Sequence, residues 1–106
     1  MTDPLVSLHA ESFDDSATLT LAGEIDLSNA DELEHEIATV TEGKRLVTID
    51  LSNVRYMDSR GVRIVHQLSR RLAASGAELK VVAPSRTFAG GVLRLTGLAE
   101  LESDDS

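Results

Sequence analysis

Residues 47–62 read VTIDLSNVRYMDSRGV, and this stretch carries the clearest structural signal in the chain. Its first part alternates apolar and polar side chains, so that Val47, Ile49 and Leu51 point one way. This alternation predicts a strand over residues 45–51. We therefore expect a largely buried strand, around which the rest of the fold is arranged.

The second part of the same stretch predicts a helix that begins where the strand leaves the sheet. We expect a loop at residues 52–57, followed by a helix of roughly residues 60–75 that Asp58 and Ser59 can cap and Gly76 ends. Free backbone N–H groups at a helix N-terminus favour an anion or a phosphoryl group. The Asp-Ser pair is therefore either a plain helix cap or a cap with a modifiable hydroxyl. The buried stripe of the helix is expected to comprise Val62, Val65, Leu68 or Ser69, and Leu72.

Upstream, the pattern predicts a hairpin and then a first helix. Residues 5–9 (LVSLH) and 17–22 (ATLTLA) are expected to be strands, with the polar residues 11–16 (ESFDDS) as the turn between them. Ser28 is the expected N-cap of the helix, and Asp31 follows three residues later, as in a capping box. The apolar face of this helix is expected to comprise Ala30, Leu33, Ile37 and Val40.

Downstream, we expect one more strand and one more helix. Residues 78–83 (ELKVVA) predict the strand, and a third helix is expected to open at Pro84 and close at Gly97. Residues 98–101 either add a short strand or pack down, and residues 102–106 predict a frayed acidic tail. The order β-β-α-β-α-β-α predicts an α/β fold, in which helices pack against a mixed sheet of four to five strands. We expect one domain over residues 1–106, with its core at about residues 5–101.

The charges of this chain are unevenly distributed. Its 106 residues have a formal net charge of −8, which argues against a general nucleic-acid binder and against attraction to an anionic membrane. Residues 1–43 hold eleven acids and no Lys or Arg, whereas residues 44–94 hold all ten bases and three acids. Residues 95–106 hold four acids. This division predicts a surface with opposite poles.

Several classes of function are disfavoured by what the sequence lacks. It has no cysteine, and its three histidines are widely spaced, so no metal site and no cofactor are expected. It has no nucleophile elbow and no phosphate-binding P-loop, so we expect no enzymatic activity. No apolar run could span a membrane and no signal peptide is evident, which predicts a cytoplasmic, soluble domain without membrane insertion.

The motifs together resemble a known family. The run IDLSNVRYMDSRGV, with AGEIDLSNA upstream and LRLTGL downstream, resembles the STAS domain of bacterial anti-sigma factor antagonists over about residues 5–101. The resemblance implies a STAS-like fold and a protein that acts by binding. Its expected partner is an anti-sigma factor of the serine-kinase type, and binding would release a sigma factor and so regulate transcription. The kinase of such a system phosphorylates the antagonist at the residue before the motif glycine, which breaks the complex.

The sequence departs from the family pattern at that acceptor. The motif is Asp58-Ser59-Arg60-Gly61, so Arg60 stands where the phosphorylated hydroxyl is expected. A phosphoserine adds a charge of about −1.5 to −2, whereas arginine adds a positive charge. The usual phosphorylation switch is therefore doubtful. Ser59 is a substitute acceptor or simply a helix N-cap. Arg60 marks either an antagonist that is regulated differently or is always competent to bind, or a solvent-exposed position where the switch was lost by drift.

A stripe of basic and polar residues follows the motif along the second helix. Arg60, Arg63, Gln67 and Arg70 recur at helical spacing, which predicts either a docking surface for an acidic partner or a solvated face partly neutralised by the acidic first helix. By resemblance, the loop at Asp26 neighbours the acceptor, although Asp26 is equally explained as a turn residue. The predicted partner-binding residues are Asp26, Met57, Asp58, Ser59, Arg60, Gly61, Arg63, Gln67 and Arg70. The sequence leaves open the oligomeric state and an alternative role as a stand-alone STAS subunit that docks on the ATPase of a lipid-transport ABC complex.

Overall fold

A computed structural model describes residues 5–83 and 101–102. The elements, in chain order, are β1 (Val6–Phe13), β2 (Ser16–Ile25), α1 (Ala30–Thr41), β3 (Leu46–Met57), α2 (Ser59–Ala74), β4 (Glu78–Val82) and β5 (Leu101–Glu102). This order confirms the predicted α/β succession from the first strand to the strand after the second helix. The third helix predicted from Pro84 to Gly97 lies outside the described residues.

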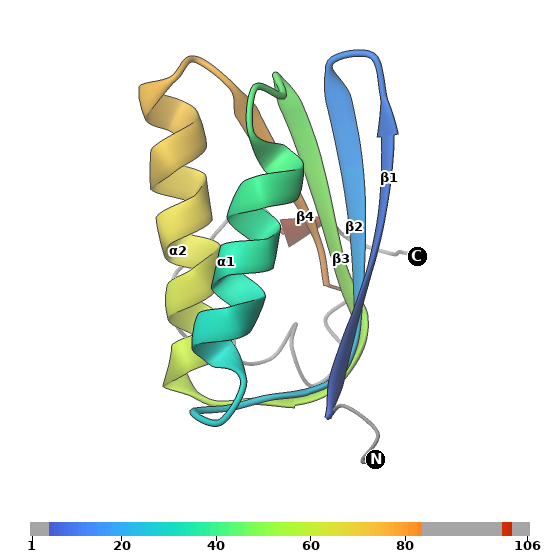
Figure 1. The fold of residues 1–106 in the computed structure, drawn as a ribbon, viewed down its shortest axis with the longest axis vertical. Coiled ribbons are helices and arrows are strands. Elements are labelled where there is room, and N and C mark those ends of the chain that lie inside the picture. The colour runs from blue at the N-terminus through green and yellow to red at the C-terminus, as the bar shows by residue number, and fades with distance from the viewer. Residues whose placement is uncertain (1–4, 84–100, 103–106) are drawn as a thin grey trace.

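The strands form one mixed sheet in the order β1-β2-β3-β4-β5. β1 pairs antiparallel with β2, and the other neighbouring strands are parallel. Both α1 and α2 lie on the same face of this sheet, as Figure 1 shows. The predicted mixed sheet with helices packed against it is therefore confirmed. β1 is the outermost strand at one side of the sheet, and on that side the sheet ends in the antiparallel hairpin of β1 and β2.

The hairpin is longer than predicted. The turn expected over residues 11–16 is wrong, because β1 runs to Phe13 and β2 begins at Ser16. Only Asp14 and Asp15 connect the strands, and Asp14 has a φ of 52°, a left-handed conformation that aspartate tolerates better than most residues. The Ser16 hydroxyl also donates a hydrogen bond to the carbonyl of Phe13 (3.0 Å). The polar composition of the segment therefore marks exposed strand ends as well as the turn itself.

The central strand is also longer than predicted, because β3 continues to Met57 through the loop expected at residues 52–57. Its pairing with β2 shifts register twice, and each shift adds a residue to β3. A bulge of this kind moves the following side chains to the opposite face. Leu51, Val54 and Met57, three residues apart, therefore all point into the core. The strict alternation of buried and more exposed residues therefore ends at Leu51, although the strand itself continues to Met57.

The core lies between the sheet and the two helices. α1 buries Ala30, Leu33, Ile37 and Thr41, and α2 buries Gly61, Ile64, Val65, Leu68 and Leu72. The predicted Val65, Leu68 and Leu72 are confirmed, whereas Val62 is only partly buried and Ile64 takes a core position instead. The helices are also joined directly, because Arg71 Nη2 donates to the buried hydroxyl of Thr41 (2.8 Å).

Candidate functional site

Two strand-to-helix turns meet at one edge of the sheet. Ile25 at the end of β2 pairs with Met57 at the end of β3. Asp26 and Asp58 follow these paired residues directly, so the loop at Asp26 lies next to the Asp58 motif, as the resemblance implied. Both helices begin at this edge, at the bottom of Figure 1. Most of the predicted partner-binding residues are therefore brought to one end of the molecule.

The turn between β3 and α2 is closed by Asp58. Its side-chain Oδ1 accepts a hydrogen bond from the backbone N–H of Arg60 (2.8 Å), which makes it the N-cap of α2. Its own N–H donates to the carbonyl of Ile25 (3.2 Å) and so ties the turn to β2. Asp58 and Ser59 were both expected to be able to cap α2. Asp58 is confirmed as the N-cap, whereas a capping role for Ser59 is wrong, because Ser59 is the first helical residue. The Ser59 side chain is left exposed.

The first turn of α2 rests directly on the core. A Cβ atom added at Gly61 would lie 2.9 Å from both Cβ and Cε of Met57 and 3.3 Å from Cγ2 of Ile25. Such distances leave no room for a side chain. Met57 is only 2% exposed and Gly61 is buried. These two residues therefore support the turn from below, while Ser59 and the half-buried Arg60 lie at its surface.

The turn between β2 and α1 is closed in a different way. Asp26 Oδ1 accepts two hydrogen bonds from Ser28, one from the backbone N–H (2.9 Å) and one from the hydroxyl (2.6 Å). Asn29 Oδ1 accepts from the Asp26 N–H (3.1 Å), and Asn29 Nδ2 donates to the carbonyl of Glu24 (2.9 Å). The backbone N–H and one carboxylate oxygen of Asp26 thus hold this turn together.

The capping box predicted for α1 is wrong. The N-cap is Asn29, and no side chain caps this helix. Ser28 lies one residue before the N-cap position and its hydroxyl donates to Asp26, while Asn29 directs its amide backward to β2 instead of forward to the helix. The hydrogen bonds from Ser28 lower the pKa of Asp26 below its ordinary value of 3.8, because they stabilise the carboxylate.

The predicted basic stripe on α2 is divided. With the Gln67 amide nitrogen facing α1, it donates to Glu34 Oε2 (2.5 Å), and the amide oxygen accepts from Arg63 Nε (3.2 Å). The middle of the stripe is therefore connected to the acidic first helix. Within the described part of the chain, the side chains of Arg60 and Arg70 have no such partner. Among the described residues, the two ends of the stripe therefore have no acidic partner, and Arg60 lies beside Ser59.

The described residues also limit other chemistry. Among residues 5–83 and 101–102, no three acidic or histidine side chains gather as a metal site would require. No helix in this part of the chain is both long and apolar enough to cross a membrane. The arrangement at the sheet edge offers hydrogen-bonding and charged groups on a fixed backbone, which suits recognition of another molecule.

Comparisons with known proteins agree with this architecture. Residues 8–103 match the family model described as Mlab, STAS domain. BtrV of Bordetella bronchiseptica, named as an anti-sigma factor antagonist, is 32% identical over 75 residues, which cover 70% of this chain and 65% of BtrV. The chain thus matches just under two thirds of the length of that relative.

Solved structures extend the likeness to almost the whole chain. A crystal structure of an anti-sigma factor antagonist from Mycobacterium paratuberculosis superposes with a TM-score of 0.81 and 27% identity, covering 99% of this chain and 92% of the other. SpoIIAA of Bacillus in its phosphorylated form superposes with a TM-score of 0.73 over 94% of this chain and 93% of its own. At 21% identity, the second match concerns the fold alone.

Proposed function

The chain belongs to the STAS domain family, and on that premise we propose that it is an anti-sigma factor antagonist that acts by binding rather than by catalysis. Its proposed partner is an anti-sigma factor of the serine-kinase type, and its proposed effect is the release of a sigma factor. The names of BtrV and of the mycobacterial protein support this assignment.

The observation that carries the proposal is the position of Ser59 and Arg60. Both lie in the first turn of α2, where the Asp58 cap and the contact of Gly61 with Met57 fix the backbone. A partner that docks here would meet Ser59, Arg60 and the following basic stripe on a surface that needs no rearrangement. The proposed contact residues are Asp58, Ser59, Arg60, Arg63, Gln67 and Arg70, with Asp26 at the neighbouring turn.

We propose further that phosphorylation does not switch this antagonist at the usual position. Arg60 has no hydroxyl, and its charge is opposite to that of a phosphoserine. An anti-sigma factor would therefore meet a surface that stays competent to bind. Ser59 is exposed and is the remaining hydroxyl of the motif, so its modification is the alternative that an experiment must separate.

Binding can be tested with the chain as affinity bait, followed by reconstitution with the purified partner. We expect capture of an anti-sigma factor and displacement of its sigma factor. Arg60→Glu and Arg63→Glu should slow association in a salt-dependent manner, because complementary charges steer encounter. Arg45→Glu is the matched control, since this exposed residue precedes β3 at the opposite edge of the sheet. Specific capture of an ATPase instead would replace this proposal with the transporter-subunit alternative.

The absence of the switch can be tested with the captured kinase and ATP, followed by mass spectrometry of the intact chain. We expect no stoichiometric phosphate on the wild-type protein, and we expect Arg60→Ser to gain phosphate at residue 60. Stoichiometric phosphate on Ser59 of the wild type would refute the unswitched antagonist. A Ser59→Ala variant that still becomes phosphorylated would direct the search to another hydroxyl.

A further inference from the structure

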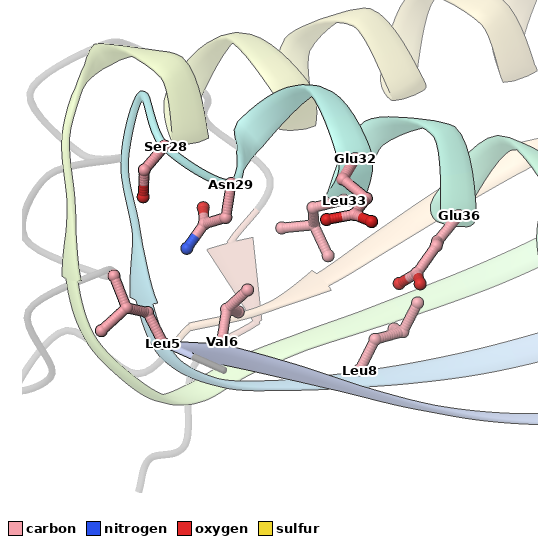
Figure 2. Close-up of a pocket in the computed structure, with 8 residues that line it drawn as sticks. All are labelled: Leu5, Val6, Leu8, Ser28, Asn29, Glu32, Leu33 and Glu36. Carbon is pink, nitrogen blue, oxygen red and sulfur yellow. The ribbon is translucent and has the colours of Figure 1, made fainter. Parts of the chain in front are cut away.

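A groove runs between the edge strand β1 and α1, away from the basic stripe of α2. A cavity of about 280 Å³ occupies one part of it, lined by Leu5, Val6, Leu8, Ser28, Asn29, Glu32, Leu33 and Glu36. Figure 2 shows the side chains of Leu5, just before β1, and of Val6 and Leu8 on β1 facing those of α1 across this space. A second cavity of about 340 Å³ is lined by Leu8, Ala10, His35, Glu36, Thr39 and Val40. Leu8 and Glu36 line both cavities, which therefore lie next to each other along β1 and α1, and we refer to the two together as the groove.

The groove has an apolar floor and an acidic rim. Val6, Leu8 and Ala10 are only partly buried although they pack against the core, and Leu5 is 49% exposed. Glu32 and Glu36 project from the exposed side of α1 at its rim. No Lys or Arg occurs anywhere in residues 1–43, so no cation of this hairpin and helix balances those carboxylates. A ligand suited to this groove would carry apolar groups flanked by positive charge.

We propose that this groove binds a cationic amphipathic segment of a protein partner. The apolar side chains of the segment would cover Leu5, Val6 and Leu8, and its Lys or Arg side chains would pair with Glu32 and Glu36. Among the described residues, β1 is the edge strand of the sheet and no other strand pairs with its outer side, where an added extended segment would find backbone groups. This surface is distinct from the first turn of α2, and its proposal does not depend on the identity of the anti-sigma factor.

A second copy of the chain fits the groove less well. A second copy would have to present the basic stripe of its α2, whose middle already contacts its own first helix, and the net charge of −8 opposes the approach of two identical molecules. An anionic lipid surface is likewise repelled by Glu32 and Glu36. Charge therefore selects a basic protein segment among the possible occupants.

The test uses the full chain labelled with ¹⁵N and a short peptide of alternating leucine and lysine as the probe, below the concentration at which the peptide aggregates. In heteronuclear NMR spectra at low salt, we expect shifts that saturate and concentrate on residues 5–10 and on the exposed side of α1. A peptide of alternating leucine and glutamate should bind at least about tenfold more weakly, which corresponds to about 1.4 kcal/mol.

Variants locate the interaction. Glu32→Gln combined with Glu36→Gln should weaken binding of the leucine-lysine peptide by about three- to tenfold, since two exposed ion pairs are lost. Asp31→Asn combined with Glu42→Gln is the matched control, because it removes the same charge from exposed positions that do not line the groove and should leave affinity unchanged. Leu8→Thr should weaken binding of the leucine-lysine peptide, because it removes apolar surface from the floor of the groove. Leu5→Thr tests the same contribution if Leu8→Thr does not fold.

Several outcomes would overturn the proposal. These are shifts spread over the surface or centred on the first turn of α2, equal binding of the two peptides, or equal weakening by the control variant. Shifts of the groove residues that depend on the concentration of the chain alone would identify a second copy as the occupant instead. An absence of saturable binding to the leucine-lysine peptide would also reject it, whether or not the chain proves to be an anti-sigma factor antagonist.

Discussion

The two strand-to-helix turns at the shared sheet edge begin alike and end differently. Each starts with an aspartate that follows one member of the pair Ile25 and Met57. Asp26 turns its carboxylate onto Ser28 within its own loop, whereas Asp58 turns its carboxylate onto the backbone of α2. The first turn is therefore stabilised by its own side chains, and the second is stabilised by the helix that it starts.

This difference decides whether the serine of each turn stabilises the turn or presents its hydroxyl to solvent. In the turn before α1, the Ser28 hydroxyl donates a hydrogen bond to Asp26 Oδ1 (2.6 Å). In the turn before α2, the Asp58 carboxylate accepts from the helix backbone instead, and among the described residues the exposed Ser59 hydroxyl has no hydrogen-bond partner. An aspartate and a serine thus hydrogen-bond to each other in the turn before α1, whereas in the turn before α2 the aspartate caps the helix and does not bind the serine hydroxyl.

The largest expected effect comes from filling the space below the second turn. Gly61→Val should lower the free energy of unfolding by about 1–3 kcal/mol, because the new side chain would overlap Met57 and Ile25. Chemical denaturation measures the change. Ala73→Val, at an exposed position of the same helix, is the control for the helix propensity of valine. Equal losses from both variants would show that packing beneath α2 is not the cause.

A smaller effect is expected from removing the Asp58 carboxylate. Asp58→Ala should cost about 1 kcal/mol of unfolding free energy, because α2 loses its side-chain cap. Asp58→Asn should restore most of that loss, since asparagine caps helices as well as aspartate does. Ser59→Ala should change stability by less than about 0.5 kcal/mol, as expected at an exposed position away from the cap. A Ser59→Ala variant as unstable as Asp58→Ala would return the capping role to Ser59.

The smallest effect is expected at the first turn and is best measured as a titration. Ser28→Ala should raise the pKa of Asp26 part of the way toward 3.8, because it removes the hydroxyl hydrogen bond, the larger cause of the lowered pKa, and keeps the backbone hydrogen bond. A carboxyl whose pKa is lowered by folding stabilises the fold above pH 3.8, and this contribution is lost as the pH falls through the folded-state pKa. The wild type and the variant should therefore differ most at neutral pH and converge in acid. NMR titration of the Asp26 carboxyl provides the measurement, and an unchanged pKa would contradict the hydrogen-bonded turn.

Much of the fold follows from local patterns, and the errors have specific physical causes. The order of strands and helices was predicted because each element carries the period of its type, as the alternation of Val47, Ile49 and Leu51 illustrates. The loop expected at residues 52–57 is strand instead, since bulges replace a spacing of two by a spacing of three. Leu51, Val54 and Met57 carry that spacing, which is the signal that could have revealed the longer strand.

The site was predicted in position but not in detail. Asp58, Ser59 and Arg60 were placed at the start of the second helix because local chain order determines a cap. Which side chain makes the cap depends on competing hydrogen bonds, and these become visible only once the turns are built. The groove beside β1 was not predicted, since its walls come from segments whose separation in space no local pattern specifies.

The missing side chain at Gly61 has a consequence for the thermodynamics of association. With the first turn of α2 seated on Met57, the backbone that displays Ser59 has little conformational freedom left to lose when a partner arrives. The cost of ordering this surface therefore falls on folding rather than on complex formation. A partner would meet a nearly rigid platform, and differences in affinity among variants of this edge should appear mainly in how fast the complex dissociates.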